Sequence, residues 1–155
     1  MKECILILDN IRSVENTGSI FRTAESLGVS KTILIGTTPT PVDRFGRKRK
    51  DFMKVSLGAE KSMNWEYQKD IKSVIKVLKD ERFLIVALEQ TPESKDIKDF
   101  NTPDKFALIV GNEINGVSQI ALDTSDEIIE ISMMGMKESL NVSVATGVTL
   151  FKLLE

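Results

Sequence analysis

The sequence predicts an α/β fold, a parallel β-sheet flanked by helices, and two observations support this prediction. Five short runs of apolar, largely β-branched residues recur along the 155 residues, and several are apolar throughout. Strands that are buried on both faces of a parallel sheet have this composition. Segments with apolar residues at helical spacing separate the runs, and such β-α-β-α alternation is typical of α/β proteins.

The elements follow in order along the chain. The expected strands cover residues 4–8, 32–35, 83–88, 106–110 and 127–131. The expected helices cover residues 17–27, 70–81, 118–122 and 142–154, where apolar residues recur every three or four positions. Residues 37–50 and 90–104 are expected to form exposed loops.

Length and composition narrow the classes of protein. A chain of 155 residues is expected to form one domain, 1–155. Its single cysteine, Cys4, cannot form an internal disulfide, which favours a cytoplasmic protein, and no apolar run is long enough to cross a membrane. The chain has no histidine, so Ser-His-Asp and Cys-His catalysis and histidine metal sites are excluded, and no metal is expected.

The charge is unevenly distributed. The net charge of −2 argues weakly against a nucleic-acid partner. Residues 43–54, however, hold six basic and two acidic side chains, a net charge of +4, which leaves −6 for the rest of the chain. A local basic cluster is more informative about partners than the total.

Polar and glycine residues follow the first expected strand. Asn16 or Thr17 is expected to cap the first helix, Gly18 allows a close approach to its first turn, and Arg22 lies one turn later on the same side. Because ligands bind at the carboxyl ends of strands in open α/β sheets, this segment is a candidate site. The alternative is a capped helix with a surface arginine.

Two further segments have the same character. After strand 106–110, Gly111 and Gly116 suggest a tight turn around a ligand, with Glu113 placed to accept hydrogen bonds; the alternative is a plain connection that turns at Asn115–Gly116. After strand 127–131, a Met-Met-Gly-Met loop leads to Ser139 and Asn141 at a helix entrance. The alternative there is a simple N-cap with the methionines in the core.

The three segments together resemble the three motifs of the SpoU/TrmH family of RNA ribose 2′-O-methyltransferases, in the SPOUT superfamily. The segments "NTGSIFRTAESLGV", "LIVGNEINGVS" and "SLNVSVATGVTLF" match motifs 1, 2 and 3 in order, and "KVSLGAE" (54–60) also looks like a family feature. The resemblance covers nearly the whole chain.

The resemblance implies a fold, a reaction and a set of residues. It implies a SPOUT fold with a C-terminal trefoil knot, a homodimer, and methyl transfer from S-adenosylmethionine to a ribose 2′-hydroxyl of tRNA or rRNA. The implied cofactor-binding residues are Gly111, Asn112, Glu113, Gly116, Ile131, Met133, Met134 and Leu140. The implied catalytic set is Asn16, Arg22, Glu113, Ser139 and Asn141.

Further expectations concern RNA and the partner copy. Arg22 is expected to orient the ribose hydroxyl and stabilise its developing charge, since no histidine is present. The small residues Ser143, Ala145, Thr146 and Gly147 are expected to let another helix approach, in a dimer interface. The candidate RNA contacts are Arg44, Arg47, Lys48, Arg49 and Lys50; alternatively, their loop is simply solvated.

Three other functions stay open on the sequence. They are a non-catalytic RNA- or cofactor-binding protein on the same fold, a methyltransferase that acts on something other than ribose, and an ordinary nucleotide-binding α/β domain. The last lacks support, because neither a G-x-G-x-x-G fingerprint nor a P-loop occurs. The chain looks like a minimal family member, which favours tRNA slightly over rRNA.

Overall fold

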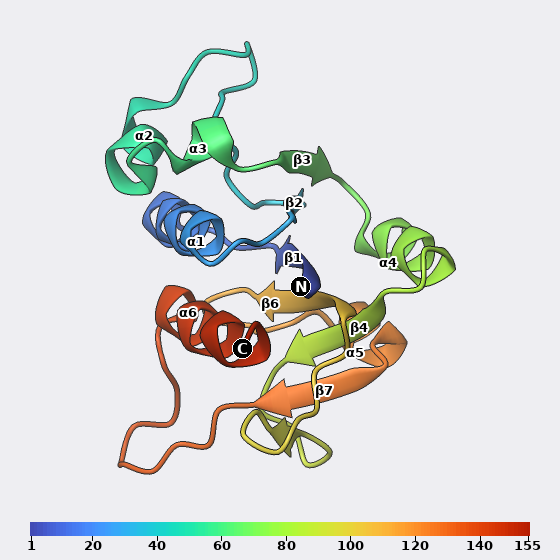
Figure 1. Cartoon of the computed structure of the whole chain (residues 1–155). Coiled ribbons are helices and arrows are strands. Elements are labelled where there is room, and N and C mark those ends of the chain that lie inside the picture. The colour runs from blue at the N-terminus through green and yellow to red at the C-terminus, as the bar shows by residue number, and fades with distance from the viewer.

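The computed structural model describes all residues, 1–155, and contains one seven-stranded parallel sheet with helices on both faces (Figure 1). The strand order is β3-β2-β1-β6-β4-β7-β5. The strands are β1 (Glu3–Asp9), β2 (Lys31–Ile35), β3 (Trp65–Gln68), β4 (Leu84–Leu88), β5 (Lys95–Asp96), β6 (Lys105–Gly111) and β7 (Glu127–Glu130). All five predicted strands are confirmed. Sequence analysis missed β3 and β5, which occupy the two edges of the sheet and lack a continuous apolar run.

The helices are α1 (Val14–Ser26), α2 (Lys50–Ser56), α3 (Ala59–Ser62), α4 (Ile71–Asp80), α5 (Gln119–Thr124) and α6 (Val142–Leu153). The four predicted helices are confirmed, with shifts of a few residues at their ends. The short helices α2 and α3 were missed, and Lys50, expected in a loop, begins α2. None of the helices combines the length and apolar character needed to cross a membrane.

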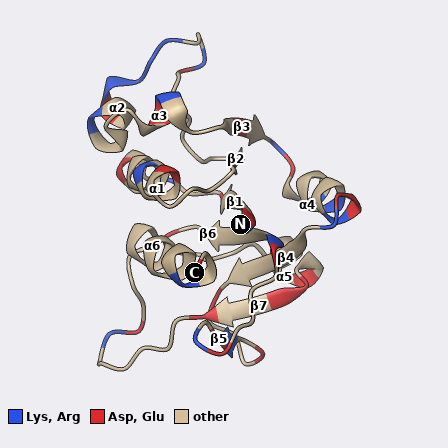
Figure 2. Cartoon of the chain, in the orientation of Figure 1, with Lys and Arg blue, Asp and Glu red and all other residues tan.

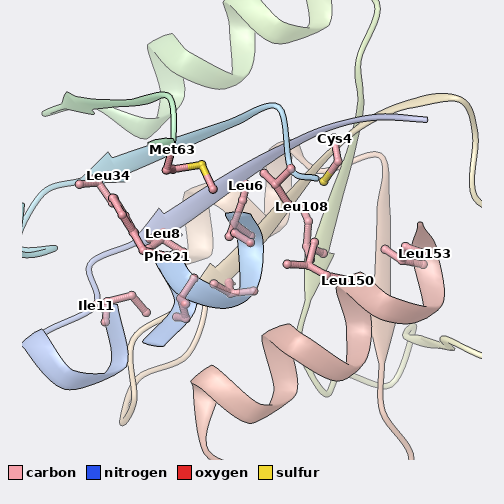
Figure 3. Close-up of a cluster of buried hydrophobic side chains, with 14 of the residues drawn as sticks. Cys4, Leu6, Leu8, Ile11, Phe21, Leu34, Met63, Leu108, Leu150 and Leu153 are labelled. Atoms are coloured by element: carbon pink, nitrogen blue, oxygen red, sulfur yellow. The ribbon is translucent and has the colours of Figure 1, made fainter. Parts of the chain in front are cut away.

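Both faces of the sheet are covered, which explains why the central strands are apolar throughout. On one face, α1 and α6 enclose a cluster of 20 buried residues, and Figure 3 shows Leu150 and Leu153 extending from α6 toward the strands. On the other face, α4 and α5 enclose a second cluster of 15 buried residues. Cys4 lies within the first cluster, where burial raises the pKa of its thiol to about 12. This cysteine therefore serves as packing and offers no reactive thiolate.

Close approaches between helices occur where the sequence has small residues. An ideal Cβ on Gly18 would lie 2.9 Å from the Val55 Cβ, so the predicted close approach is made by α2. A Cβ on Gly147 would lie 3.4 Å from the Thr23 Cγ2, so Gly147 faces α1 of the same chain. The predicted role of the small residues in a dimer interface stays a prediction, and Val144, Val148 and Phe151 are the apolar residues that α6 exposes.

Candidate active site

A cavity of about 480 Å³ lies where the carboxyl ends of β4, β6 and β7 meet the start of α6. Its volume is typical of a pocket for a small organic ligand. Its lining alternates apolar side chains with polar groups and backbone, and comes from segments 88–90, 110–116, 130–133 and 139–145. Seven of the eight predicted cofactor-binding residues line it: Gly111, Asn112, Glu113, Gly116, Ile131, Met133 and Leu140.

Glu113 joins the loop after β6 to the start of α1. Its carboxylate accepts hydrogen bonds from the Arg12 N–H (3.1 Å), the Ser13 N–H (3.0 Å) and the Asn16 Nδ2 (3.1 Å). Partial burial acts to raise the pKa of Glu113, but the bonds from Ser13, Asn16 and Arg12 outweigh it, and the pKa lies below its ordinary value. Glu113 is therefore an ionised acceptor that fixes the entrance of α1, and the prediction that it accepts hydrogen bonds is confirmed.

Asn16 connects Glu113 to the start of α6, and its side chain can do so because it does not cap α1. The predicted cap is wrong: Ser13 is the N-cap, and its Oγ accepts the Asn16 N–H at 3.1 Å. The Asn16 side chain is thereby free to donate to Glu113, and its Oδ1 accepts from the Asn141 Nδ2 at 3.2 Å. One amide side chain thus connects all three polar segments.

Asn141 completes the network at the entrance of α6. It is the N-cap of this helix, and its Oδ1 accepts the Ser143 N–H at 2.9 Å. The hydrogen bonds run in one direction, from Ser143 through Asn141 and Asn16 to Glu113, and each amide both donates and accepts; the Asn141 Oδ1 accepts from the Ser143 Oγ as well, at 2.6 Å. An amide is the side chain that can do both at a single position. Of the two caps that the sequence allowed, Asn141 is confirmed, and Ser139 lines the cavity.

The two glycines of the second segment shape the loop itself. A Cβ on Gly111 would lie 2.2 Å from the Val117 backbone nitrogen, and Gly116 has φ +70°. The turn therefore closes tightly on its own backbone, as expected, and the expectation that it surrounds a ligand stays a prediction. Residues 110–116 of this loop form one wall of the cavity.

Glu89 is a cavity residue that the sequence did not suggest. It follows β4, and its carboxylate accepts the Val117 N–H (2.9 Å) and the Gln90 N–H (3.0 Å). A Cβ on Gly116 would lie 2.1 Å from the Glu89 Oε2, so the glycine makes room for this carboxylate. The available signal was its position directly after a buried strand, where ligands bind in open α/β sheets.

The methionine loop is only partly at the cavity. Met133 lines it, whereas Met134 is 87% exposed and does not. Met136 is fully exposed as well, so the alternative in which these methionines belong to the core is wrong for both. The predicted role of Met134 at the cofactor stays a prediction.

Arg22 lies apart from the cavity, in a wide groove of about 1030 Å³ between α1, α2 and α6. The groove is also lined by Lys54 of α2 and by Gly147 and Phe151 of α6. Four of the five predicted catalytic residues therefore border the cavity or bind the network at its mouth, and Arg22 does not.

The predicted basic loop is a hairpin that extends away from the sheet above α2 (Figure 1). An isolated antiparallel bridge joins Val42 to Lys48, and the Asp43 N–H donates to the Arg47 carbonyl at 2.8 Å. Figure 2 shows Lys and Arg gathered on the hairpin and α2, and Asp and Glu prominent around β7. Arg47 and Arg49 pair with Asp43 and Asp51, at 2.9 and 2.8 Å.

Comparisons with known proteins agree with this geometry. The profile described as the SpoU rRNA Methylase family matches residues 3–151. The chain is 31% identical to the 23S rRNA (guanosine-2′-O-)-methyltransferase RlmB of Neisseria meningitidis over 94% of this chain and 56% of that protein. It is also 31% identical to the tRNA (guanosine(18)-2′-O)-methyltransferase of Aquifex aeolicus, over 97% of this chain and 68% of that protein.

A solved structure supports the fold. The SpoU methyltransferase AviRb from Streptomyces viridochromogenes, in complex with AdoMet, superimposes with a TM-score of 0.86 at 23% identity, over 99% of this chain and 57% of that one. The chain thus spans little more than half of the length of RlmB and of AviRb. The profile match over 3–151 and the Aquifex relative nevertheless decide the family, and this chain belongs to the SpoU rRNA Methylase family.

Proposed function

We propose that this chain is an RNA methyltransferase that moves a methyl group from S-adenosylmethionine to a ribose 2′-hydroxyl. The observation that carries the proposal is the network Asn16–Glu113–Asn141, which joins the three polar segments at the mouth of the cavity. Relatives named as guanosine 2′-O-methyltransferases at 31% identity support the same reaction. A purely structural network would not need all three segments to converge beside a cavity.

The cavity residues fit S-adenosylmethionine. The cavity volume of about 480 Å³ is large enough for a ligand of this size. Ile131, Met133 and Leu140 offer apolar and sulfur contacts for the flat adenine base. Glu89 and the backbone of 111–116 offer hydrogen-bond acceptors and donors for the polar parts. S-Adenosylmethionine, when bound, supplies an electrophilic methyl on a sulfonium, so the chain needs no metal to activate it. AviRb, solved with AdoMet, supports this choice of ligand.

The work left to the chain is to orient and activate a poor nucleophile. We propose that Arg22 does this by donating hydrogen bonds to the 2′-oxygen as its negative charge develops. An arginine stays protonated in proteins, so the proton leaves to an RNA phosphate or to water. Most of the rate increase is then expected from alignment of the two reacting groups.

We propose a homodimer that pairs the exposed residues Val144, Val148 and Phe151 of α6 with a second copy. Phe151 and Arg22 border the same groove, so this interface would bring Arg22 next to the partner. Arg22 is then available to the cavity of the partner, which accounts for its absence from the cavity of its own chain.

Several finer features belong to the same proposal. The RNA is expected to contact the basic hairpin, and tRNA is the first substrate to test. After β7, near the far edge of the sheet, residues 131–141 bring the chain back to α6, which packs on α1. The proposal that this part of the chain forms a trefoil knot rests on the family resemblance. We further propose that residues 1–155 act as one methyltransferase domain in the cytoplasm.

The decisive experiment is transfer of labelled methyl from S-adenosylmethionine to unmodified total RNA, separated by size and digested to nucleosides. Label in a 2′-O-methylnucleoside is the expected result, and the labelled RNA band identifies tRNA or rRNA. Label in a base would instead favour a different methyl acceptor. No label, with cofactor binding intact by calorimetry, would favour the non-catalytic binding protein.

Shared sites can be tested by mixing two inactive variants, Arg22→Ala and Asn141→Ala. If each site combines Arg22 of one copy with the cavity of the other, a mixed dimer has one site with both residues intact. Mixing and co-refolding should then restore up to about a quarter of wild-type activity, since half of the dimers are mixed and each has one intact site of two. No recovery, with mixed dimers shown by tagged pull-down, would place Arg22 and the cavity of the same copy in one site.

A further inference from the structure

The tip of the basic hairpin presents an aromatic ring that packs against no core. Phe45 is 66% exposed, although it is one of only 7 phenylalanines in the chain and three others are fully buried. It is flanked by two guanidinium groups, with the Arg44 Cζ 4.8 Å and the Arg47 Cζ 5.0 Å from its ring centroid. Both guanidinium groups lie over the ring, and the residue nevertheless stays largely exposed.

The hairpin tip is held in a defined shape. The Asp43 carboxylate accepts the Phe45 N–H (2.8 Å), the Arg47 N–H (3.0 Å) and the Arg47 Nε (2.9 Å). Gly46 supplies the positive φ of +77° that the turn needs. The bond from the Arg47 backbone is the largest cause that lowers the pKa of Asp43, so the carboxylate stays ionised. The ring is thus displayed by a structured turn.

The charge around the ring identifies the kind of partner. Arg44, Lys48 and Lys50 have no carboxylate within 4 Å, and Asp43 is turned inward to the loop amides. A cationic rim around an exposed aromatic face suits an anionic chain that also has flat aromatic groups. Single-stranded RNA has both, and base stacking on aromatic side chains together with arginine planes is how proteins commonly hold unpaired nucleotides.

The hairpin leads directly into α2, whose Lys54 lines the groove that contains Arg22. An RNA strand with a ribose at Arg22 can therefore continue along Lys54 toward Phe45. We propose that Phe45 is a stacking platform for an unpaired base of the RNA, flanking the nucleotide that is methylated. This inference rests on the proposed function for the identity of the RNA strand, and it adds a separate site with a separate chemistry.

The test compares Phe45→Ala, Phe45→Leu and Phe45→Trp in the full chain. The probes are an unstructured oligoribonucleotide of about 12 nucleotides and a duplex with the same number of phosphates. Loss of stacking should weaken single-strand binding about 5- to 100-fold in the Ala variant, with little change on the duplex. Leu should behave like Ala, and Trp should bind at least as tightly as the wild type.

Two readouts guard against a folding artefact. Trp65 is the only tryptophan, so the emission added by Phe45→Trp reports the platform directly, and it should be quenched by the single strand alone. The salt dependence of binding should be unchanged in the Ala variant, because stacking releases no counterions. An Ala variant that binds like the wild type, or a Leu variant that does so, would overturn the inference.

The remaining outcomes distinguish the stacking platform from other roles of the hairpin and from the proposed reaction. Equal losses on single strand and duplex would mean that the hairpin contacts phosphate only, and a changed oligomeric state would make Phe45 a protein contact; both overturn the platform. A chain that transfers methyl normally but binds independently of Phe45 overturns this inference alone. A chain that transfers no methyl but shows Phe45-dependent binding retains the platform and overturns the proposed reaction.

Discussion

The cavity and the groove of Arg22 are built in opposite ways. At the cavity, residues from three distant segments bind one another: Glu113 accepts three hydrogen bonds, and Asn16 links it to Asn141. In the groove and on the hairpin, the residues proposed to contact RNA, such as Arg22 and Lys48, are exposed. Neither Arg22 nor Lys48 forms an ion pair within the chain. The first region is complete within one chain, whereas the second presents free cations.

This difference separates the two ligands that a methyl transfer needs. A small cofactor is recognised best by a preformed cavity, whose polar groups are fixed before the ligand arrives. A large anionic substrate is recognised by exposed cations, whose contribution depends on salt. Changes at the cavity should therefore alter stability and cofactor affinity together, and changes in the groove should alter catalysis or RNA affinity alone.

The largest effect is expected for Arg22→Ala. Removal of a group that stabilises charge only in the transition state should lower the rate of methyl transfer about 100-fold or more. Because Arg22 does not line the cavity, the affinity for S-adenosylmethionine should stay within about twofold of wild type. Single-turnover transfer and calorimetry measure the two quantities.

Arg22→Lys is the matched control for Arg22→Ala, since it keeps the charge and loses the planar fork of donors. It should recover part of the rate. Turnover at the wild-type rate in Arg22→Ala would refute a catalytic role, and an equal loss of cofactor affinity would assign Arg22 to the cavity instead.

The second largest effect is expected for Asn16→Asp. The substitution replaces a donor with a carboxylate, 3.1 Å from the Glu113 carboxylate, and removes the link to it. We expect a loss of about 1–3 kcal/mol in the free energy of unfolding, together with weaker cofactor binding. Urea denaturation and calorimetry provide the measurements.

Asn16→Ala separates the lost hydrogen bonds from the added repulsion in Asn16→Asp. It should destabilise the chain less than Asp does, because it leaves Glu113 with its two backbone donors, Arg12 and Ser13. If Asn16→Ala were as stable as the wild type, the amide network would not be the element that joins the three segments.

The central sheet could be predicted from the sequence because burial on both faces leaves a direct mark. The strands 4–8 and 106–110 are apolar throughout, and they pair at the centre of the sheet as β1 and β6. The edge strand β3 reads Trp-Glu-Tyr-Gln and is only partly buried, so no apolar run marks it. The helix α2 was missed because its charged start, Lys50–Asp51, continues the polar composition of the loop before it.

The site residues were predicted from family motifs, and the motifs could not supply geometry. The cap of α1 was assigned to Asn16 or Thr17, since both residue types cap helices, whereas the structure uses Ser13 and leaves Asn16 for the network. Glu89 lies outside all three motifs, and only the sheet order brings the end of β4 beside the end of β6. Local pattern identifies which residues can act, and long-range pairing decides which of them meet.

A smaller effect is expected for the triple variant Arg47→Ala, Lys48→Ala and Arg49→Ala. RNA binding should weaken about tenfold at moderate salt, and the slope of log affinity against log salt should become shallower by about one to two. Arg47 and Arg49 already pair with aspartates, so the change should be less than three phosphate contacts would give.

The matched control for the triple hairpin variant replaces Lys69, Lys72 and Lys76 with Ala. These three exposed lysines lie just before α4 or within it, on the opposite face of the sheet. It changes the net charge equally and should leave the salt slope near that of the wild type. An unchanged slope in the hairpin variant, or an equal change in the control, would mean that the hairpin has no specific role in RNA binding.

The smallest effect is expected in the pH dependence that Glu113 contributes. Because the folded chain lowers the pKa of Glu113 below its ordinary value of 4.5, the carboxylate stabilises the fold fully above pH 4.5. That contribution is lost as the pH falls through the lowered folded value. Asp43, Asp51 and other carboxylates with lowered pKa lose stability in the same window, so the acid unfolding of the wild type alone cannot isolate Glu113.

A comparison of the wild type with Glu113→Gln isolates the pH-dependent stability that Glu113 contributes. The glutamine can still accept the Ser13 and Arg12 N–H groups but does not titrate, so the other carboxylates cancel in the difference between the two chains. The stability advantage of the wild type should be constant from pH 7 to about pH 5 and should shrink below pH 4.5, as urea midpoints can measure. A difference that stays constant down to pH 3 would mean that Glu113 acts through the shape of its hydrogen bonds and not through its charge.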